Sequence, residues 1–312
     1  ISESDYRQRQ SKAIDLFNQS LKNDPETTLA LCNFVVGDVL SNHSFSPGFK
    51  LHCLNWLIDH HLDRCDESYE QHPEDDGFPE GFYDLIDCQW KFKWIIPTLA
   101  RDLFLDKKEI EEANETMRYH YENMRFSLSS FYKTLMLQNI LTGDHTAAKE
   151  NFQKWQQTAT DEFSDCPACE QTEQVNFYHF IGQYQKAIDA AQPILTGEMT
   201  CAEVPHITYH PAIDSMIRLG KYPEAERLLD EAIDKINAEE DEIFVRLIPL
   251  FSQLSYKLGQ STPLFNMPKT TICSIWTTSS HSTPLTKMRR NMPASLPPTS
   301  TNATATAITK AR

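Results

Sequence analysis

Glycine is scarce in this sequence, with 9 in 312 residues. The low glycine content and the hydrophobic content of 40% favour a mostly helical protein over a β-sandwich. No apolar run approaches the roughly 18–20 residues of a membrane-spanning helix, so no membrane segment is expected. Acidic residues outnumber basic ones by 44 to 29, giving a net charge of −15. Because such a chain repels phosphates, no nucleic-acid partner is expected either.

Sequence motifs of catalysis are also missing. The chain has no G-x-S-x-G, no H-E-x-x-H, no Walker loop and no dinucleotide fingerprint. The acid-rich runs at 109–112 and 239–242 are typical of solvated faces or helix N-termini rather than of catalytic carboxylate pairs. The sequence therefore predicts a protein that is not an enzyme. The eight cysteines are scattered through helical patterns, which indicates reduced thiols and a cytoplasmic location.

The last 48 residues, 265–312, lack acidic side chains altogether. They contain 17 serines and threonines, five prolines and six lysines and arginines. One interpretation is a disordered tail, because the segment offers little apolar surface to offset the entropy of ordering it. The other is an altered reading frame, since the change in composition interrupts a repeat. The sequence leaves both open.

Four glycines mark an internal repeat. Gly143, Gly182, Gly220 and Gly259 are 39, 38 and 39 residues apart, and each follows an apolar segment. The first three are followed, five residues later, by Ala148, Ala187 and Ala225. Apolar residues recur nine and twelve residues after each of these three glycines, which places them on one face of a helix. The pattern predicts helices that end at a left-handed glycine and then pack closely through alanine.

The segments Leu219-Gly-Lys-Tyr-Pro-Glu-Ala225 and Ile181-Gly-Gln-Tyr-Gln-Lys-Ala187 resemble the tetratricopeptide repeat (TPR). The resemblance covers roughly residues 125–264. It implies an all-α solenoid, a right-handed superhelix of antiparallel helix pairs whose concave face binds peptides or proteins. The period exceeds the usual length of about 34 residues, which implies longer helices or linkers. Pro193 is expected to kink or shorten one helix.

The N-terminal region, 1–124, is also predicted to be helical, either as degenerate leading repeats or as a small bundle. Leu51, Leu54 and Ile58 belong to one amphipathic stripe. A polar loop is expected over 66–81, and two helices over 107–141 with a break near 124–127. Six histidines and cysteines between positions 52 and 72 have no compact four-ligand spacing, so no metal site is predicted there.

Cys166 and Cys169 form the one C-x-x-C sequence. No strand pattern precedes it, as a thioredoxin-like redox site would require. A structural interpretation places the pair at a helix start, where Pro167 suits the first helical position. A third interpretation is a structural zinc site, in which Cys201 and His206 of the next linker complete a Cys3His set. No other cofactor is expected.

The TPR resemblance also implies which residues line the concave groove, since the first helix of each pair faces inward. Counting back from each glycine gives Lys133, Asn176, His179, His210, Asp214, Arg218, Arg246, Gln253 and Lys257. Cations flanked by amides suit a peptide's carboxylates and backbone. The favoured hypothesis is a scaffold that binds a peptide or protein partner there without catalysis. The alternative is a regulator that responds to a ligand or peptide, with or without a zinc staple.

Overall fold

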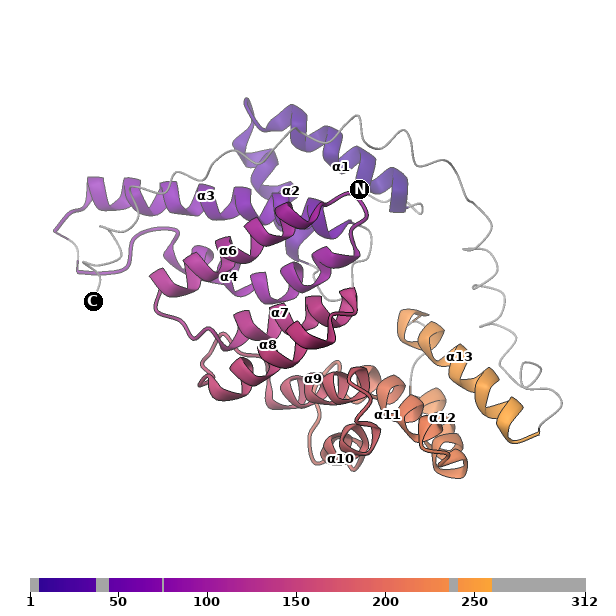
Figure 1. The fold of residues 1–312 in the computed structure, drawn as a ribbon. Coiled ribbons are helices and arrows are strands. Elements are labelled where there is room, and N and C mark those ends of the chain that lie inside the picture. The colour runs from indigo at the N-terminus through magenta and orange to yellow at the C-terminus, as the bar shows by residue number, and fades with distance from the viewer. Residues whose placement is uncertain (1–5, 38–44, 75, 236–240, 260–312) are drawn as a thin grey trace. The chain divides into compact units, whose positions relative to one another are not determined.

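The computed structural model describes residues 6–37, 45–74, 76–235 and 241–259, coloured in Figure 1. Every regular element in these ranges is a helix, which confirms the all-α prediction for them. Among them, no helix combines the length and hydrophobicity that a membrane span needs. The described residues form two compact units that divide between Phe163 and Ser164. The tail predicted over 265–312 lies outside the described residues.

The first unit holds the leading helices and the first of the glycine-marked pairs. Its elements are α1 (Tyr6–Ser20), α2 (Pro25–Gly37), α3 (Pro47–Gln71), α4 (Phe82–Trp90), α5 (Phe92–Ile95), the 3-10 helix η1 (Ile96–Arg101), α6 (Lys107–Asn123), α7 (Ser129–Thr142) and α8 (His145–Gln157). The predicted stripe of Leu51, Leu54 and Ile58 lies on α3 and is buried. The break between α6 and α7 falls where it was expected.

The polar segment 66–81 is less of a loop than the sequence suggested. The helix α3 continues through Gln71, so the described part of the loop comprises only residues 72–74 and 76–81. Long polar side chains are good helix formers, and α3 is anchored by the buried face earlier in its length. Polarity alone was therefore a poor indicator of a helix end.

The division between the units also falls later than the predicted boundary at 124/125. The helix α7 packs on η1 and α6, both in the first unit. The Phe163 backbone carbonyl accepts hydrogen bonds from Lys93 Nζ at 3.0 Å and Ser130 Oγ at 2.8 Å. The Phe163 ring stacks on Phe126 with ring centroids 3.7 Å apart. These contacts fix the segment after α8 to the first unit, so the pair α7–α8 belongs to that unit.

The second unit consists of two helix pairs and a further helix. Its elements are α9 (Pro167–Phe180), α10 (Tyr184–Leu195), α11 (His206–Arg218), α12 (Tyr222–Lys235) and α13 (Asp241–Lys257). The first helix of each pair contacts its partner, α9 with α10 and α11 with α12. It also contacts the helix after its partner, so α9 packs on α11 and α11 packs on α13 (Figure 1). Pro193 lies in the last turn of α10, which ends two residues later. The three helices α9, α11 and α13 therefore pack one after another within this unit.

The glycine turns have the same backbone geometry in both units. Gly143, Gly182 and Gly220 have φ values of 77°, 75° and 74°. In each turn the N–H after the glycine donates to the carbonyl five residues earlier, at 2.9 Å in all three cases. The glycine N–H donates to the carbonyl three residues earlier. These two bonds define the Schellman helix end and confirm the predicted role of glycine.

The alanines of the repeat are buried as predicted. Ala148, Ala187 and Ala225 are each 0% exposed, as are Ala191 and Ala232 further along the same faces. A methyl group at these positions brings the helix backbones close together, and a larger side chain would hold them apart. The repeat pattern therefore reflects packing within each helix pair.

We predict that Gly220→Ala lowers the free energy of unfolding by about 1–2 kcal/mol, because alanine is strained at this φ. No atom lies within 4 Å of an added Cβ at Gly220, so the loss would come from the backbone alone. Gly37→Ala is the matched control, since Gly37 ends α2 without a positive φ and with equal free space. Urea unfolding followed by circular dichroism would measure both. Equal losses in the two variants would contradict the prediction.

Candidate functional site

Polar side chains from successive helices meet in the second unit. The Nε2 of His179, on α9, lies 2.7 Å from Oδ2 of Asp214, on α11. The Nε of Arg218, one turn along α11, donates to the same oxygen at 3.3 Å. Asp214 is only 7% exposed, whereas 53% of the Arg218 side chain is exposed. A buried carboxylate thus holds an imidazole and a guanidinium at the surface.

His210 and Arg246 extend this group along α11 and onto α13. The rings of His179 and His210 lie edge to face, with centroids 6.2 Å apart. Burial lowers the pKa of His210, and the nearby charges of His179 and Arg246 lower it further, against the opposing effect of Asp214. His210 is therefore neutral at pH 7, while Arg246 is exposed and charged. We call His179, His210, Arg218 and Arg246 the histidine–arginine surface.

The four residues of this surface and Asp214 were all predicted to line the groove. Five of the nine predicted groove residues therefore come together. Asn176 is half-buried and donates to Glu173 of its own helix at 2.9 Å. Gln253 is half-exposed and Lys257 is exposed, both on α13. None of these three makes a contact with the histidine–arginine surface that the structure records within the described residues.

Lys133 does not occupy the solvated groove position that was expected. It lies on α7 in the first unit and is 1% exposed. The inward face of α7 packs against the helices of that unit, so the Lys133 side chain is enclosed in the core and offers no surface to a partner. Counting back from Gly143 located the correct helix face, but this face is covered.

Charge is distributed unevenly over the second unit. Residues 164–259 contain sixteen Asp and Glu against seven Lys and Arg. On α12 the acidic residues are Glu224, Glu226, Asp230, Glu231 and Asp234. In contrast, 245–259 contains no acidic residue but holds Arg246 and Lys257. The histidine–arginine surface is therefore a cationic region of an otherwise acidic unit.

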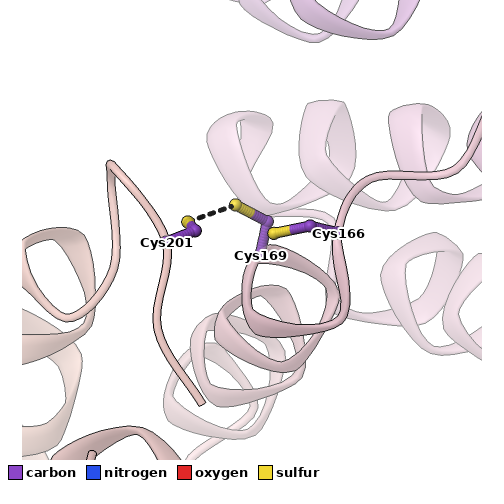
Figure 2. Close-up of side chains that lie close together, drawn as sticks. All are labelled: Cys166, Cys169 and Cys201. Carbon is purple, nitrogen blue, oxygen red and sulfur yellow. Dashed lines mark hydrogen bonds between the residues drawn. The ribbon is translucent and has the colours of Figure 1, made fainter.

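Three thiols form a second cluster, shown in Figure 2. Cys166 occupies the residue position just before α9, Cys169 lies in the first turn of α9, and Cys201 comes from the linker between α10 and α11. The three Sγ atoms all lie within 4.8 Å of one another, and those of Cys169 and Cys201 are 3.4 Å apart. His206, the predicted fourth ligand, does not belong to this group. The linker turns the chain so that Cys201 approaches α9, whereas His206 begins α11.

The helix end distinguishes Cys166 from Cys169 electrostatically. Burial tends to raise the pKa of the Cys166 thiol, but the nearby N–H groups of Cys169 and Ala168 and the thiols of Cys169 and Cys201 lower it overall. Burial raises the pKa of Cys169, and its neighbouring thiols raise it further. Cys166 is also exposed, while Cys169 is half-buried. Cys166 is thus the more readily ionised thiol.

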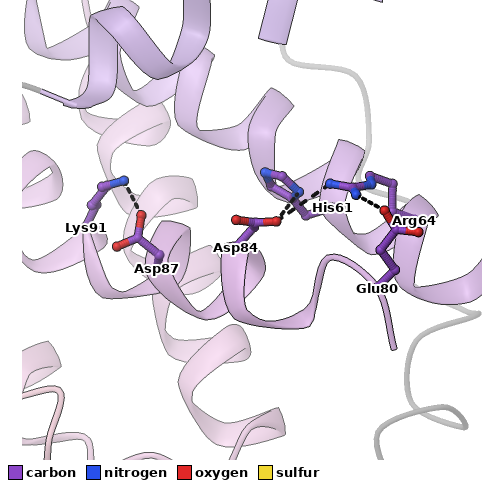
Figure 3. A network of polar contacts seen from close by, with 6 residues as sticks. All are labelled: His61, Arg64, Glu80, Asp84, Asp87 and Lys91. Carbon is purple, nitrogen blue, oxygen red and sulfur yellow. Dashed lines mark hydrogen bonds and ion pairs between the residues drawn. The ribbon is translucent and has the colours of Figure 1, made fainter. Parts of the chain in front are cut away.

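The polar network of the first unit is structural (Figure 3). Arg64, on α3, is paired with Glu80 and lies 3.6 Å from Asp84 of α4. His61 Nδ1 lies 3.9 Å from the same Asp84 carboxylate. Burial lowers the pKa of His61, although Asp84 opposes the shift. These contacts join Glu80 of the loop to α3 and link α3 to α4. Within the described part of this unit no three potential metal ligands lie together.

Comparison of the chain with family models found no match, and neither did the searches of curated proteins and of solved structures. The described residues define an all-α protein whose second unit is built from helix pairs.

We predict that Asp214→Asn lowers the free energy of unfolding at pH 7 by about 1–3 kcal/mol, because two bonds to an ionised carboxylate are weakened. The hydrogen bond from His179 lowers the pKa of Asp214 below its usual 3.8; burial opposes this, and the charges of His179 and Arg218 add to it. A depressed pKa contributes stability above the unfolded-state pKa, and that contribution is lost as pH falls through the folded-state value.

The difference between wild type and Asp214→Asn should therefore shrink as the pH falls below the unfolded-state pKa of an aspartate. Thermal unfolding across a pH series would measure it. Asp189→Asn, at an exposed carboxylate on α10, is the control and should cost less than about 0.5 kcal/mol at every pH. A difference for Asp214→Asn that persists unchanged to pH 2 would be inconsistent with this assignment.

Proposed function

We propose that the protein is a non-catalytic helical-repeat scaffold whose histidine–arginine surface binds an acidic segment of a peptide or protein partner. The observation that carries the proposal is the convergence of His179, Asp214 and Arg218 from α9 and α11, with His210 and Arg246 beside them. The glycine turns and buried alanines support a TPR-like superhelix for this unit, with α9, α11 and α13 on its concave side.

The chemistry of the surface favours carboxylates as ligands. The recorded contact of Arg218 with Asp214 uses Nε, which leaves the two terminal nitrogens of an exposed guanidinium for a ligand. Two parallel N–H donors match the two oxygens of a carboxylate. Neutral His210 adds a hydrogen-bonding group without charge. Asp214 holds His179 and Arg218 in place, so less ordering entropy is lost when a ligand binds.

The acidic helices around this surface would contribute to specificity. Five carboxylates on α12 repel an acidic peptide from that helix, while Arg218 on α11 and Arg246 on α13 attract it. Complementary charge of this kind guides association and excludes other orientations. A partner with a compact acidic segment fits this pattern better than a uniformly acidic one.

The thiols support a reducing compartment for this function. All seven cysteines among the described residues are free, including four buried ones. Free thiols persist where cellular reductants keep them reduced, so we propose the cytoplasm as the location.

A ligand-responsive regulator is the second candidate. The thiol cluster favours it, because a group at the start of α9 could couple a small ligand or metal to the helix that carries His179. Closure of the second unit on binding a peptide, seen as a change in small-angle scattering, would favour the regulator. An unchanged profile would favour the scaffold.

We predict that the full chain selects acidic members from an array of synthetic peptides of varied charge. The double variant Arg218→Glu and Arg246→Glu should weaken this binding by about tenfold or more, because attraction is replaced by repulsion. Its helical circular dichroism should stay unchanged, since both side chains are exposed. Fluorescence anisotropy with the selected peptide would measure the affinity.

The matched control is Arg227→Glu with Lys235→Glu, which changes the net charge equally but lies on α12. It should alter the affinity by less than about threefold, an effect of net charge alone. A preference for neutral or basic peptides would exclude the proposal. So would an equal loss of binding in the two double variants.

A further inference from the structure

The thiol cluster joins two segments that are distant in the sequence. Cys166 and Cys169 hold the start of α9, and Cys201 comes from the linker that leads into α11 (Figure 2). The linker is turned toward α9 by two hydrogen bonds to the Val204 carbonyl, from Cys201 N at 3.2 Å and Thr200 Oγ1 at 3.0 Å. The fold of the linker therefore fixes the backbone position of Cys201.

A small apolar core packs against two of the three cysteines. Ala168, Ile194 and Val204 are buried together, and Cys169 and Cys201 pack against them. Ile194 comes from α10, so α9, α10 and the linker all contribute to this core. Cys166 is exposed, which gives a ligand access from solvent.

The spacing of the sulfurs matches that of ligands around one metal ion. Zinc bound by thiolates has Zn–S distances of about 2.3 Å, so two sulfurs in a tetrahedral site are about 3.8 Å apart. The distance of 3.4 Å between the sulfurs of Cys169 and Cys201, and the limit of 4.8 Å for all three pairs, bracket this value. Small rotations of the side chains would bring all three into contact with an ion.

We propose that Cys166, Cys169 and Cys201 bind one Zn²⁺ through three sulfur ligands, leaving a fourth coordination position for water or another ligand. Three sulfurs and no protein carboxylate favour a thiophilic ion over Mg²⁺ or Ca²⁺. His206 is excluded from the set because its ring nitrogens do not lie with the sulfurs. A disulfide is a poorer explanation of the cluster, since it would use two sulfurs and leave the third without a role.

Such an ion would fasten the linker to the first helix of the second unit. His179 is thirteen residues beyond Cys166, about 20 Å along the helix. The zinc site is therefore separate from the histidine–arginine surface, and either proposal can fail without the other.

The test is the metal content of the full chain, expressed with zinc, copper and iron in the medium and purified with a phosphine reductant and no chelator. Mass spectrometry of the elements should find about one zinc per chain. Cys166→Ser, Cys169→Ser and Cys201→Ser should each reduce the zinc content by about tenfold or more. His206→Ala and Cys273→Ser are the matched controls and should retain it.

A second measurement does not depend on whether the serine variants fold. Cobalt added to metal-free wild-type protein should give the thiolate-to-cobalt charge-transfer band and the visible bands of a tetrahedral site. Bound zinc should also protect Cys166, Cys169 and Cys201 from alkylation, as mapped by peptide mass spectrometry. His206→Ala should leave the cobalt spectrum unchanged.

The proposal would be overturned if the purified protein held no metal and also gave no cobalt band. Copper bound in place of zinc would overturn it as well. A Cys169–Cys201 disulfide in the protein purified under reducing conditions would do the same. Loss of zinc from His206→Ala would overturn the three-ligand set in favour of a Cys3His site. Loss from Cys273→Ser would assign the metal to a thiol outside the cluster.

Discussion

The second unit depends on one backbone constraint, the reversal of direction at a left-handed glycine. At Gly182 and Gly220 two hydrogen bonds close the helix end, and the next helix begins two residues later. Such a short turn forces the second helix back against the first, and Ala187 and Ala225 permit the close approach. Because each pair is compact, the first helices of successive pairs can pack on one another. The contact between α9 and α11 then brings His179 to Asp214, 35 residues away in the sequence.

The two sites use this arrangement at opposite ends of α9. Near its N-terminus, Cys166 and Cys169 meet a cysteine from a linker. Near its C-terminus, His179 meets the carboxylate of a neighbouring helix. Both sites therefore require the same register between α9 and the segment that follows α10. A buried carboxylate and a buried apolar core hold that register at the two ends, by hydrogen bonds in one case and by packing in the other.

The proposed binding surface differs in charge from the rest of the second unit. The chain is strongly acidic, and α12 carries much of the negative charge of the second unit. Arg218 and Arg246 are only two cations, but they lie on the neighbouring helices α11 and α13. A cationic surface within a negative protein attracts acidic ligands while the net charge limits nonspecific association with nucleic acid. In the first unit, by contrast, Lys93 and Lys133 are buried and contribute to the core.

The sequence by itself determined the all-α class, the glycine helix ends, the buried alanines and the helices that carry the candidate residues, because these follow from local periodicity and backbone conformation. It did not determine that Lys133 is enclosed, that the pair α7–α8 belongs to the first unit, or that α3 continues to Gln71. Nor could it show that Cys201 joins Cys166 and Cys169 without His206. Only the tertiary structure decided these points, since burial and ligand sets depend on which faces pack together and how a linker turns. Spacing along the chain fixes the face of a helix, but not what covers it.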